Sequence, residues 1–155
     1  MCTDTDHTLR HVAKGDLEEL LELYQHLHPR DPSPTLDARL RAQWRQMLAD
    51  DNMHILVAVA DAGLVASCTL VLVCNLTHGA RPYGLIENVV TRAAHRRKGY
   101  ARQVVEWALE IAWQKRCYKV MLMTGSASAL QFYDRCGFVR GVKTGLVAYP
   151  DQSAN

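Results

Sequence analysis

The segment with the clearest chemical potential is a run of three cations, Arg96, Arg97 and Lys98, followed directly by Gly99. It follows an apolar, β-branched run at residues 85–91 and precedes a pattern typical of an amphipathic helix. A helix start carries unpaired backbone N–H groups and about half a positive charge, and a glycine lets those groups approach an anion. The segment therefore predicts a site for a pyrophosphate, with a solvated basic loop as the alternative.

A second candidate is Glu87, the only carboxylate in the apolar run 85–90. Strand alternation places Glu87 on the same face as Leu85 and Val89. A carboxylate among such neighbours needs hydrogen bonds or takes a raised pKa, and both are typical of groups that transfer protons. An edge carboxylate that faces water is the alternative interpretation.

Both candidates need a framework of strands and helices to hold them. The hydrophobic pattern predicts strands near residues 7–12, 52–60, 64–76, 83–91 and 118–124, with a further extended segment at 138–149. Helices are expected at 16–28, 36–48, from residue 100 onward, and at 126–135. Asp61-Ala62-Gly63 has the composition of a hairpin turn. The prediction is a single α/β (α+β) domain over residues 1–155, whose mixed, mainly antiparallel sheet contains one parallel β-α-β crossover.

Composition limits the classes of function. The chain has 155 residues and a net charge of +2, which argues against nucleic-acid or membrane binding. Its five cysteines, Cys2, Cys68, Cys74, Cys117 and Cys136, form no CxxC pair and are predicted to be reduced core residues. We therefore expect a cytoplasmic protein without a membrane span, and we expect no metal site, because His26 and His28 lack a third ligand nearby.

Two motifs give the chain a family resemblance. Arg96, Gly99 and Ala101 fit the pattern Arg/Gln-x-x-Gly-x-Gly/Ala, and a second pattern, Ala-x-x-Phe-Tyr-x-x-x-Gly-Phe, begins at Ala129 and includes Tyr133. In both motifs and in the order of its elements, the chain resembles the GNAT superfamily of acyl-CoA-dependent N-acetyltransferases. The resemblance implies the GNAT fold, with the order β-α-α-β-β-β-α-β-α-β.

The resemblance also implies acetyl-CoA as cosubstrate. The backbone from Arg96 to Arg102 would wrap the pyrophosphate, and residues 89–91 would pair through their main chain with the pantetheine arm. Ser126 stands where the family often has asparagine, so it is expected to contact the cofactor weakly or to act only as a helix cap. The predicted cofactor-binding residues are Val89, Val90, Thr91, Arg96, Arg97, Lys98, Gly99, Tyr100, Ala101, Arg102 and Ser126.

Acyl transfer to an amine needs a base for the amine, a stabilised oxyanion and a proton for the leaving thiolate. We predict Glu87 as the base, acting directly or through water, and a backbone N–H near Val89 or Val90 for the oxyanion. The family match implies that Tyr133 protonates the thiolate, although the pair of Tyr133 with Phe132 would otherwise indicate a core tyrosine. Cys136 lacks a paired histidine and is interpreted as a structural thiol.

The acceptor is expected to be a primary amine on a small molecule or a protein, attacked directly in a ternary complex. Position in the superfamily suggests Tyr24, His28, Arg30 and Tyr83 as substrate-binding residues, and relatives often form homodimers. An inactive module of the same fold that only binds CoA is the alternative, and the joint presence of Glu87 and Tyr133 favours catalysis.

Overall fold

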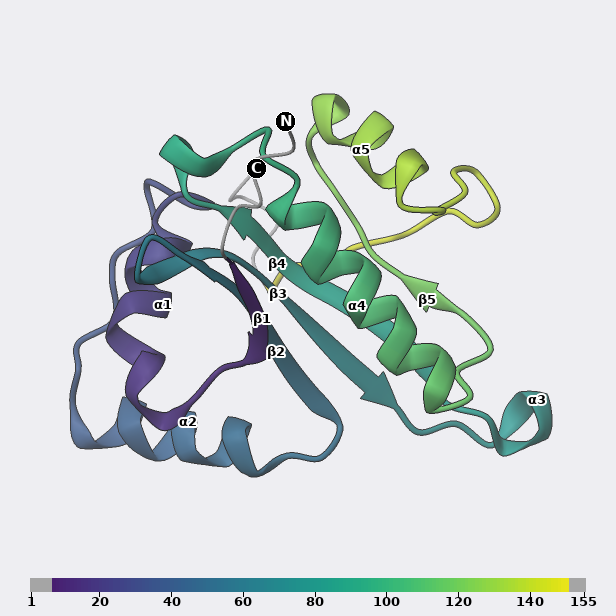
Figure 1. Ribbon diagram of the computed structural model, residues 1–155. Helices are drawn as coiled ribbons and strands as arrows, with labels where there is room; N and C mark the ends of the chain where they lie inside the picture. Colours follow the sequence, from purple (N-terminus) through teal and green to yellow (C-terminus); the bar gives the residue numbers. More distant parts are fainter. Residues whose placement is uncertain (1–6, 151–155) are drawn as a thin grey trace. The chain divides into compact units, whose positions relative to one another are not determined.

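The computed structural model describes residues 7–150, and these fall into two compact units (Figure 1). The first unit ends at Leu122, and the second begins at Met123. All the strands of the described residues lie in the first unit, which therefore carries the sheet and its flanking helices. The expectation of one functional domain over the whole chain remains a prediction.

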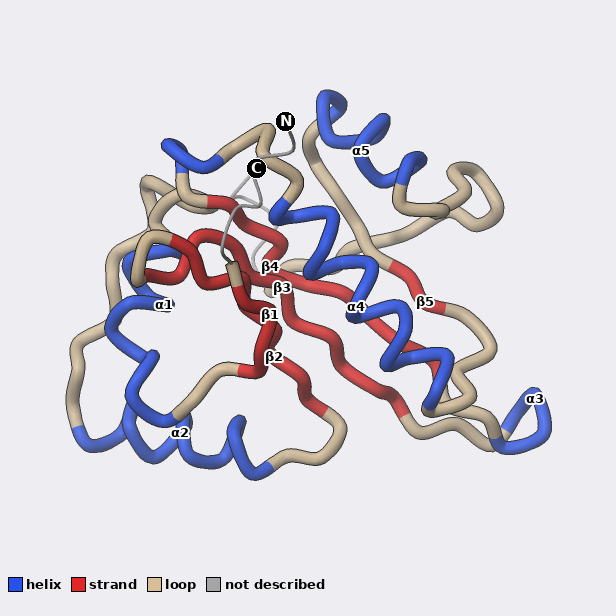
Figure 2. Tube along the Cα trace, in the orientation of Figure 1, coloured by secondary structure: helices blue, strands red, loops and turns tan. Residues whose placement is uncertain are grey.

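The sheet has five strands in the order β1-β2-β3-β4-β5 (Figure 2). Neighbouring strands are antiparallel except β4 and β5, which are parallel because a helix connects them. This confirms the predicted mixed, mainly antiparallel sheet. The strands are β1 (Thr8–His11), β2 (Met53–Ala60), β3 (Gly63–Val73), β4 (Tyr83–Thr91) and β5 (Val120–Met121).

The predicted hairpin turn joins β2 to β3. Asp61 and Ala62 both have a left-handed backbone, with φ of 51° and 61°, as a two-residue hairpin turn with right-handed strand twist requires. Gly63 opens β3, and a Cβ there would lie 2.7 Å from Oε1 of Glu19. The same Oε1 accepts a hydrogen bond of 2.6 Å from the Leu64 amide, so Glu19 holds this turn against the first helix.

Helices cover both faces of the sheet. On one face, α1 (Leu17–Tyr24) and α2 (Ala38–Ala49) bury Leu20, Leu23 and Trp44 against Ile55 and Val57 of β2. On the other face, α4 (Tyr100–Gln114) buries its apolar stripe, and the Cys68 thiol of β3 donates to the Val104 carbonyl at 3.3 Å. Figure 1 shows α4 crossing in front of β3 and β4. The short helix α3 (Thr77–Ala80) replaces an expected loop.

The second unit contains α5 (Leu130–Arg135) but no strand among its described residues. The predicted extended segment at 138–149 therefore forms no sheet, and this part of the predicted element order is wrong. Gly141 has φ of 74°, which interrupts an extended backbone, and Val139 and Leu146 are exposed rather than packed on a neighbouring strand.

The cysteines follow the sequence interpretation with one correction. Cys68, Cys117 and Cys136 are buried free thiols, and burial raises the pKa of Cys68 to about 12. Cys74, which follows β3, is exposed and is not a core residue. Cys2 lies outside the described residues. Within residues 7–150, no helix is long and apolar enough to cross a membrane.

Candidate active site

The loop between β4 and α4 ends in a backbone shaped to approach a ligand. Gly99 has φ of 89°, and a Cβ placed on it would meet no protein atom within 4 Å. Arg97, two residues earlier, is also left-handed, with φ of 64°. This strand-loop-helix order is the one that the sequence predicted for an anion site (Figure 2).

The start of α4 supplies the donors. Its first hydrogen bond runs from the Gln103 amide to the Gly99 carbonyl at 3.1 Å, so the amides of Tyr100 and Ala101 have no carbonyl one turn earlier. The 15-residue helix adds about half a positive charge at this end. Tyr100 is 3% exposed and packs edge-on against His7, so its ring belongs to the core and does not extend toward a ligand.

Arg96 does not point its charge at this site. Its guanidinium donates to the Thr91 carbonyl at 3.4 Å and to the His26 carbonyl at 3.2 Å. The Ala93 amide also donates to Nδ1 of His26 at 3.4 Å. Arg96 therefore ties the loop to the segment that follows α1, a role that its place in the motif did not reveal.

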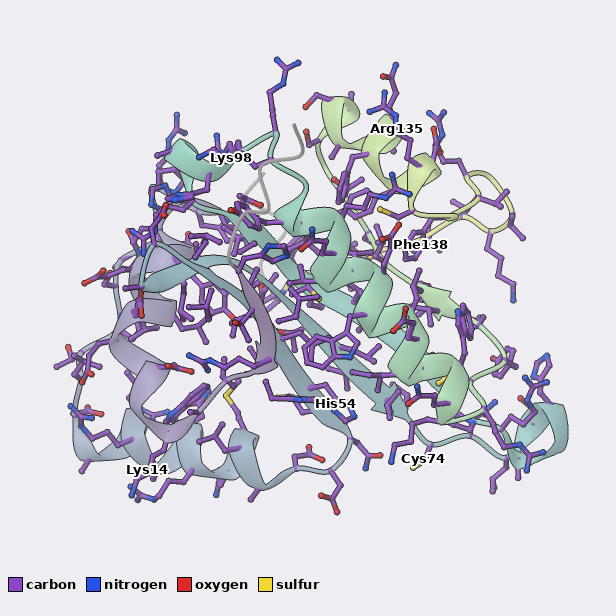
Figure 3. All side chains as sticks on the ribbon, in the orientation of Figure 1. Lys14, His54, Cys74, Lys98, Arg135 and Phe138 are labelled. Carbon is purple, nitrogen blue, oxygen red and sulfur yellow. The ribbon has the colours of Figure 1, made fainter. Side chains whose placement is uncertain are left out.

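The remaining cations differ in what they contact. Arg97 and Lys98 are exposed, and neither has an ion-pair partner within residues 7–150. Figure 3 places Lys98 in the loop before α4. Arg102 is one turn into the helix, where its Nε donates to Oε1 of Glu106 at 2.6 Å. Arg97 and Lys98 are thus the side chains best placed to meet a phosphate.

The part of β4 just before this loop has an open edge. Strand β5 pairs with β4 only at Gly84 and Leu85, so from Ile86 onward this edge has no strand partner in the described part of the chain. Unpaired strand edges bind extended, amide-bearing groups through main-chain hydrogen bonds. Residues 89–91, which were predicted to pair with the pantetheine arm, lie on this open stretch.

A bulge at Asn88 changes which side chains share a face. Thr69 pairs with Glu87, but Ser67 pairs with Val90, so β4 has one residue more than β3 between these pairs. Asn88 has φ of 53°, a left-handed backbone that asparagine adopts more readily than most other residues. Val90, and not Val89 as strict alternation predicted, therefore lies on the face of Glu87 and packs in the core below α1.

The surroundings of Glu87 also differ from the prediction. Glu87 is exposed rather than enclosed by apolar neighbours. Its cross-strand neighbour is Thr69, a polar side chain. The carboxylate has no ion pair among residues 7–150, so it is open to an incoming amine. Its role as a base stays a prediction.

Next to Glu87 the structure reveals polar residues that the sequence analysis missed. Ser67 and Thr69 are buried on the α1 face of β3, beside the Tyr24 phenol. Burial raises the pKa of the Tyr24 phenol, and nearby Thr69, Ser67 and Asn88 side chains oppose that increase. Two polar residues at alternating positions in an apolar strand were the available signal.

The other predicted substrate-binding residues lie apart. His28 and Arg30 are exposed in the turns after α1, where the His28 amide donates to the Tyr24 carbonyl at 3.1 Å. Tyr83 begins β4, four residues before Glu87, and packs against Tyr118 with Lys119 above its ring. His28 and Arg30 thus follow Tyr24 by a few residues in the sequence. Tyr83 lies at the opposite end of β4 from residues 89–91.

Tyr133 and Ser126 belong to the second unit. Tyr133 lies in α5 and makes edge-to-face contacts with Phe132 at 5.0 Å and Phe138 at 5.9 Å between ring centroids. Ser126 precedes a short 3-10 turn, but its hydroxyl bonds to the Ser128 hydroxyl at 2.8 Å and does not cap the turn. The expected capping role of Ser126 is therefore wrong, and the proton-donating role of Tyr133 stays a prediction.

The chain is similar in sequence and in structure to known acetyltransferases. The model of the acetyltransferase (GNAT) family matches residues 17–138. A glucosamine 6-phosphate N-acetyltransferase of Trypanosoma brucei brucei is 31% identical over 86% of this chain and 89% of its own length. Glucosamine 6-phosphate N-acetyltransferase 1 of Oryza sativa subsp. japonica is 33% identical over 89% and 82%. A solved structure from Agrobacterium tumefaciens str. C58, assigned as an acetyltransferase, is 47% identical with a TM-score of 0.86, covering 92% of this chain and 99% of its own.

Proposed function

Because the chain belongs to the GNAT family of acetyltransferases, we propose that it transfers the acetyl group of acetyl-CoA to the primary amine of a small polar acceptor, such as an amino sugar phosphate. N-acetyltransferase activity, which the sequence predicted, is confirmed by the family match and the relatives. The observation that carries the choice of cosubstrate is the loop before α4, where left-handed Gly99 opens a helix end. The choice of acceptor is supported by the two relatives described as acting on glucosamine 6-phosphate.

The residues of the first unit fit acetyl-CoA in two places. The amides of Tyr100 and Ala101, with the charges of Arg97 and Lys98, suit the pyrophosphate. The open edge of β4 suits the pantetheine arm, because that arm carries amides that can pair with strand carbonyls and N–H groups. Acetyl-CoA would supply the thioester that the acceptor amine attacks.

The proton transfers are assigned to two residues. The amine nitrogen attacks the thioester carbonyl, Glu87 takes the amine proton directly or through water, and the carbon–sulfur bond breaks. The Tyr133 hydroxyl then gives its proton to the departing thiolate. Exposure of Glu87 on the open part of β4 supports its share of this scheme. No covalent enzyme intermediate is required, so transfer takes place within one ternary complex.

The test is a thiol-release assay with acetyl-CoA and a panel of primary amines that includes glucosamine 6-phosphate. We expect release that depends on both the amine and the enzyme, with a mass gain of one acetyl group on the acceptor. Glu87→Gln should lower the rate and abolish the pH dependence assigned to the base, whereas Glu110→Gln on α4 should change neither. Stabilisation by acetyl-CoA without thiol release across the panel would instead support the non-catalytic CoA-binding alternative.

Cytoplasmic location and a homodimeric state complete the proposal. Both are proposed from the sequence, the second because relatives in the superfamily often form homodimers. Cell fractionation and light scattering of the purified protein would test them separately from activity.

A further inference from the structure

A histidine–aspartate pair joins the loop before α4 to the hairpin between β2 and β3. Nε2 of His95 lies 2.9 Å from Oδ2 of Asp61, 34 residues earlier in the chain. Because an ionised carboxylate only accepts hydrogen bonds, Nε2 is the donor. This hydrogen bond is the main cause that holds the pKa of Asp61 below its usual range. The proposed reaction gives the pair no role.

The two partners differ in exposure. The His95 side chain is 14% exposed, whereas that of Asp61 is 80% exposed. Within residues 7–150, Nδ1 of His95 is buried and has no hydrogen-bond partner, so the bond to Asp61 is the polar contact that fixes the orientation of the ring. A pair with such an exposed member contributes little to stability. The fold alone therefore explains this contact poorly.

The His95 ring lies next to the groups that were assigned to the pyrophosphate. Its centroid is 6.2 Å from that of Tyr100, which begins α4. Between these two residues, Arg97 and Gly99 both have left-handed backbones, with φ of 64° and 89°. The left-handed conformation is unfavourable for arginine, so contacts at the sides of the loop must hold this shape.

Two other contacts hold the loop at different places. The Arg92 amide donates to the Val65 carbonyl at 2.8 Å, which fixes the start of the loop on β3. The Arg96 guanidinium donates to the His26 carbonyl at 3.2 Å, which ties the loop to the segment after α1. The histidine–aspartate pair adds a third anchor, at the turn of the β2–β3 hairpin.

We propose that His95 and Asp61 position the loop before α4 for cofactor binding, so that the turn of the β2–β3 hairpin sets the affinity for CoA. This inference rests on the proposed function, because it concerns the cofactor site of the same reaction. The pair keeps the amides of Tyr100 and Ala101 where a phosphate meets them. Both members act through the backbone of the loop and touch no reacting atom, so they are positioning residues.

Two substitutions at Asp61 separate the hydrogen bond from the charge. Asp61 has φ of 51°, a conformation that asparagine and glycine both tolerate. Asp61→Asn removes the charge but keeps an oxygen that accepts from His95, whereas Asp61→Gly removes both. In isothermal titration with CoA, we expect Asp61→Gly to bind about fivefold more weakly than the wild type, through loss of the hydrogen bond. Asp61→Asn should stay within about twofold of the wild type, because a neutral hydrogen bond remains.

The direction of the change distinguishes positioning from electrostatics. The Asp61 carboxylate lies near Lys98, whose charge also lowers the pKa of this carboxylate. A negative charge at this place opposes the binding of an anion. If charge were the only influence of Asp61, both variants would bind CoA more tightly than the wild type, and the inference would be overturned.

Stability and kinetics distinguish positioning from a structural role. Glycine relieves the left-handed backbone, so Asp61→Gly should melt at or above the wild-type temperature. Ala62→Gly, at φ of 61° in the same turn, is the matched control and should keep wild-type affinity for CoA. Asp61→Gly should raise the KM for acetyl-CoA about fivefold and leave kcat within about twofold. An affinity that falls only together with the melting temperature would make the pair structural and refute the inference.

The histidine is tested by a conservative replacement and a double-mutant cycle. Glutamine can place an amide N–H close to the position of Nε2, so His95→Gln should bind CoA more tightly than His95→Ala. Asp61→Gly should add no further loss of affinity in the His95→Ala background. Additive losses would mean that the two residues act independently, which contradicts the inference.

Binding and turnover together separate this inference from the proposed function. If the wild type binds CoA without thiol release and Asp61→Gly weakens that binding, the positioning role stands and the proposed reaction fails. If thiol release depends on the amine and Asp61→Gly keeps wild-type affinity, the proposed reaction stands and the positioning role fails. A wild-type protein that does not bind CoA would refute both.

Discussion

Replacement of Gly99 by alanine separates the backbone role of the loop before α4 from its effect on folding. Gly99 has φ of 89°, and an added Cβ would touch no protein atom within 4 Å. The cost to stability is therefore the left-handed backbone alone, about 1–2 kcal/mol. For a chain of this size that lowers the melting temperature by about 2–8 °C. Gly79, with φ of 70° and equally open space, is the matched control and should show the same loss in Gly79→Ala.

The two variants should differ in cofactor binding. In Gly99→Ala the new methyl group occupies the space where a pyrophosphate approaches the amides of Tyr100 and Ala101, so the affinity for CoA should fall about tenfold or more. Gly79→Ala should keep wild-type affinity. Arg97→Ala removes one exposed charge and should cost less than Gly99→Ala, about two- to fivefold. Isothermal titration with CoA measures all three, and equal losses in Gly99→Ala and Arg97→Ala would refute the backbone mechanism.

Three further changes test other parts of the structure. Gly63→Ala should lower the free energy of unfolding by about 1–2 kcal/mol in urea titrations, because its Cβ would lie 2.7 Å from Oε1 of Glu19, and Glu19→Ala should relieve most of that clash. His11 and His54 bond to each other at 3.2 Å, and burial lowers the pKa of both; the unfolded chain therefore binds protons first, and stability should fall as the pH drops below about 6.5. Urea midpoints between pH 7.5 and 5 should show this loss, and His54→Gln should reduce it. Tyr133→Phe keeps the packing of the ring but should lower kcat about 100-fold, and a rate within threefold of wild type would remove Tyr133 as the acid.

The fold was largely predictable because its signals are local. The two-residue turn at Asp61 and Ala62 and the apolar stripe of α4 gave the right elements from composition and period alone. The segment 138–149 failed for a nonlocal reason. Its three valines are compatible with a strand, but a strand also needs a partner, and the left-handed Gly141 interrupts the backbone.

The site was predictable only where its chemistry depends on the residue type. Glycine in a helix-opening loop has a direct meaning, and Gly99 adopts the left-handed backbone that the motif implies. The direction of the Arg96 side chain has no such local signal, because its acceptors are the carbonyls of Thr91 and His26, the latter 70 residues away. The motif therefore predicted a backbone role for Arg96 but gave no indication that its guanidinium ties the loop to the segment after α1.

The bulge at Asn88 lies between Glu87 and the β4 residues 89–91. One extra residue in β4 moves Val89 off the face that carries Glu87 and turns Val90 into the core. Where the strand is distorted in this way, β5 has already separated from it after Leu85. Glu87 is exposed, and the edge of the residues that follow it has no strand partner in the described part of the chain. The bulge therefore determines which β4 side chains share the face of Glu87, whereas the unpaired edge follows from the shortness of β5.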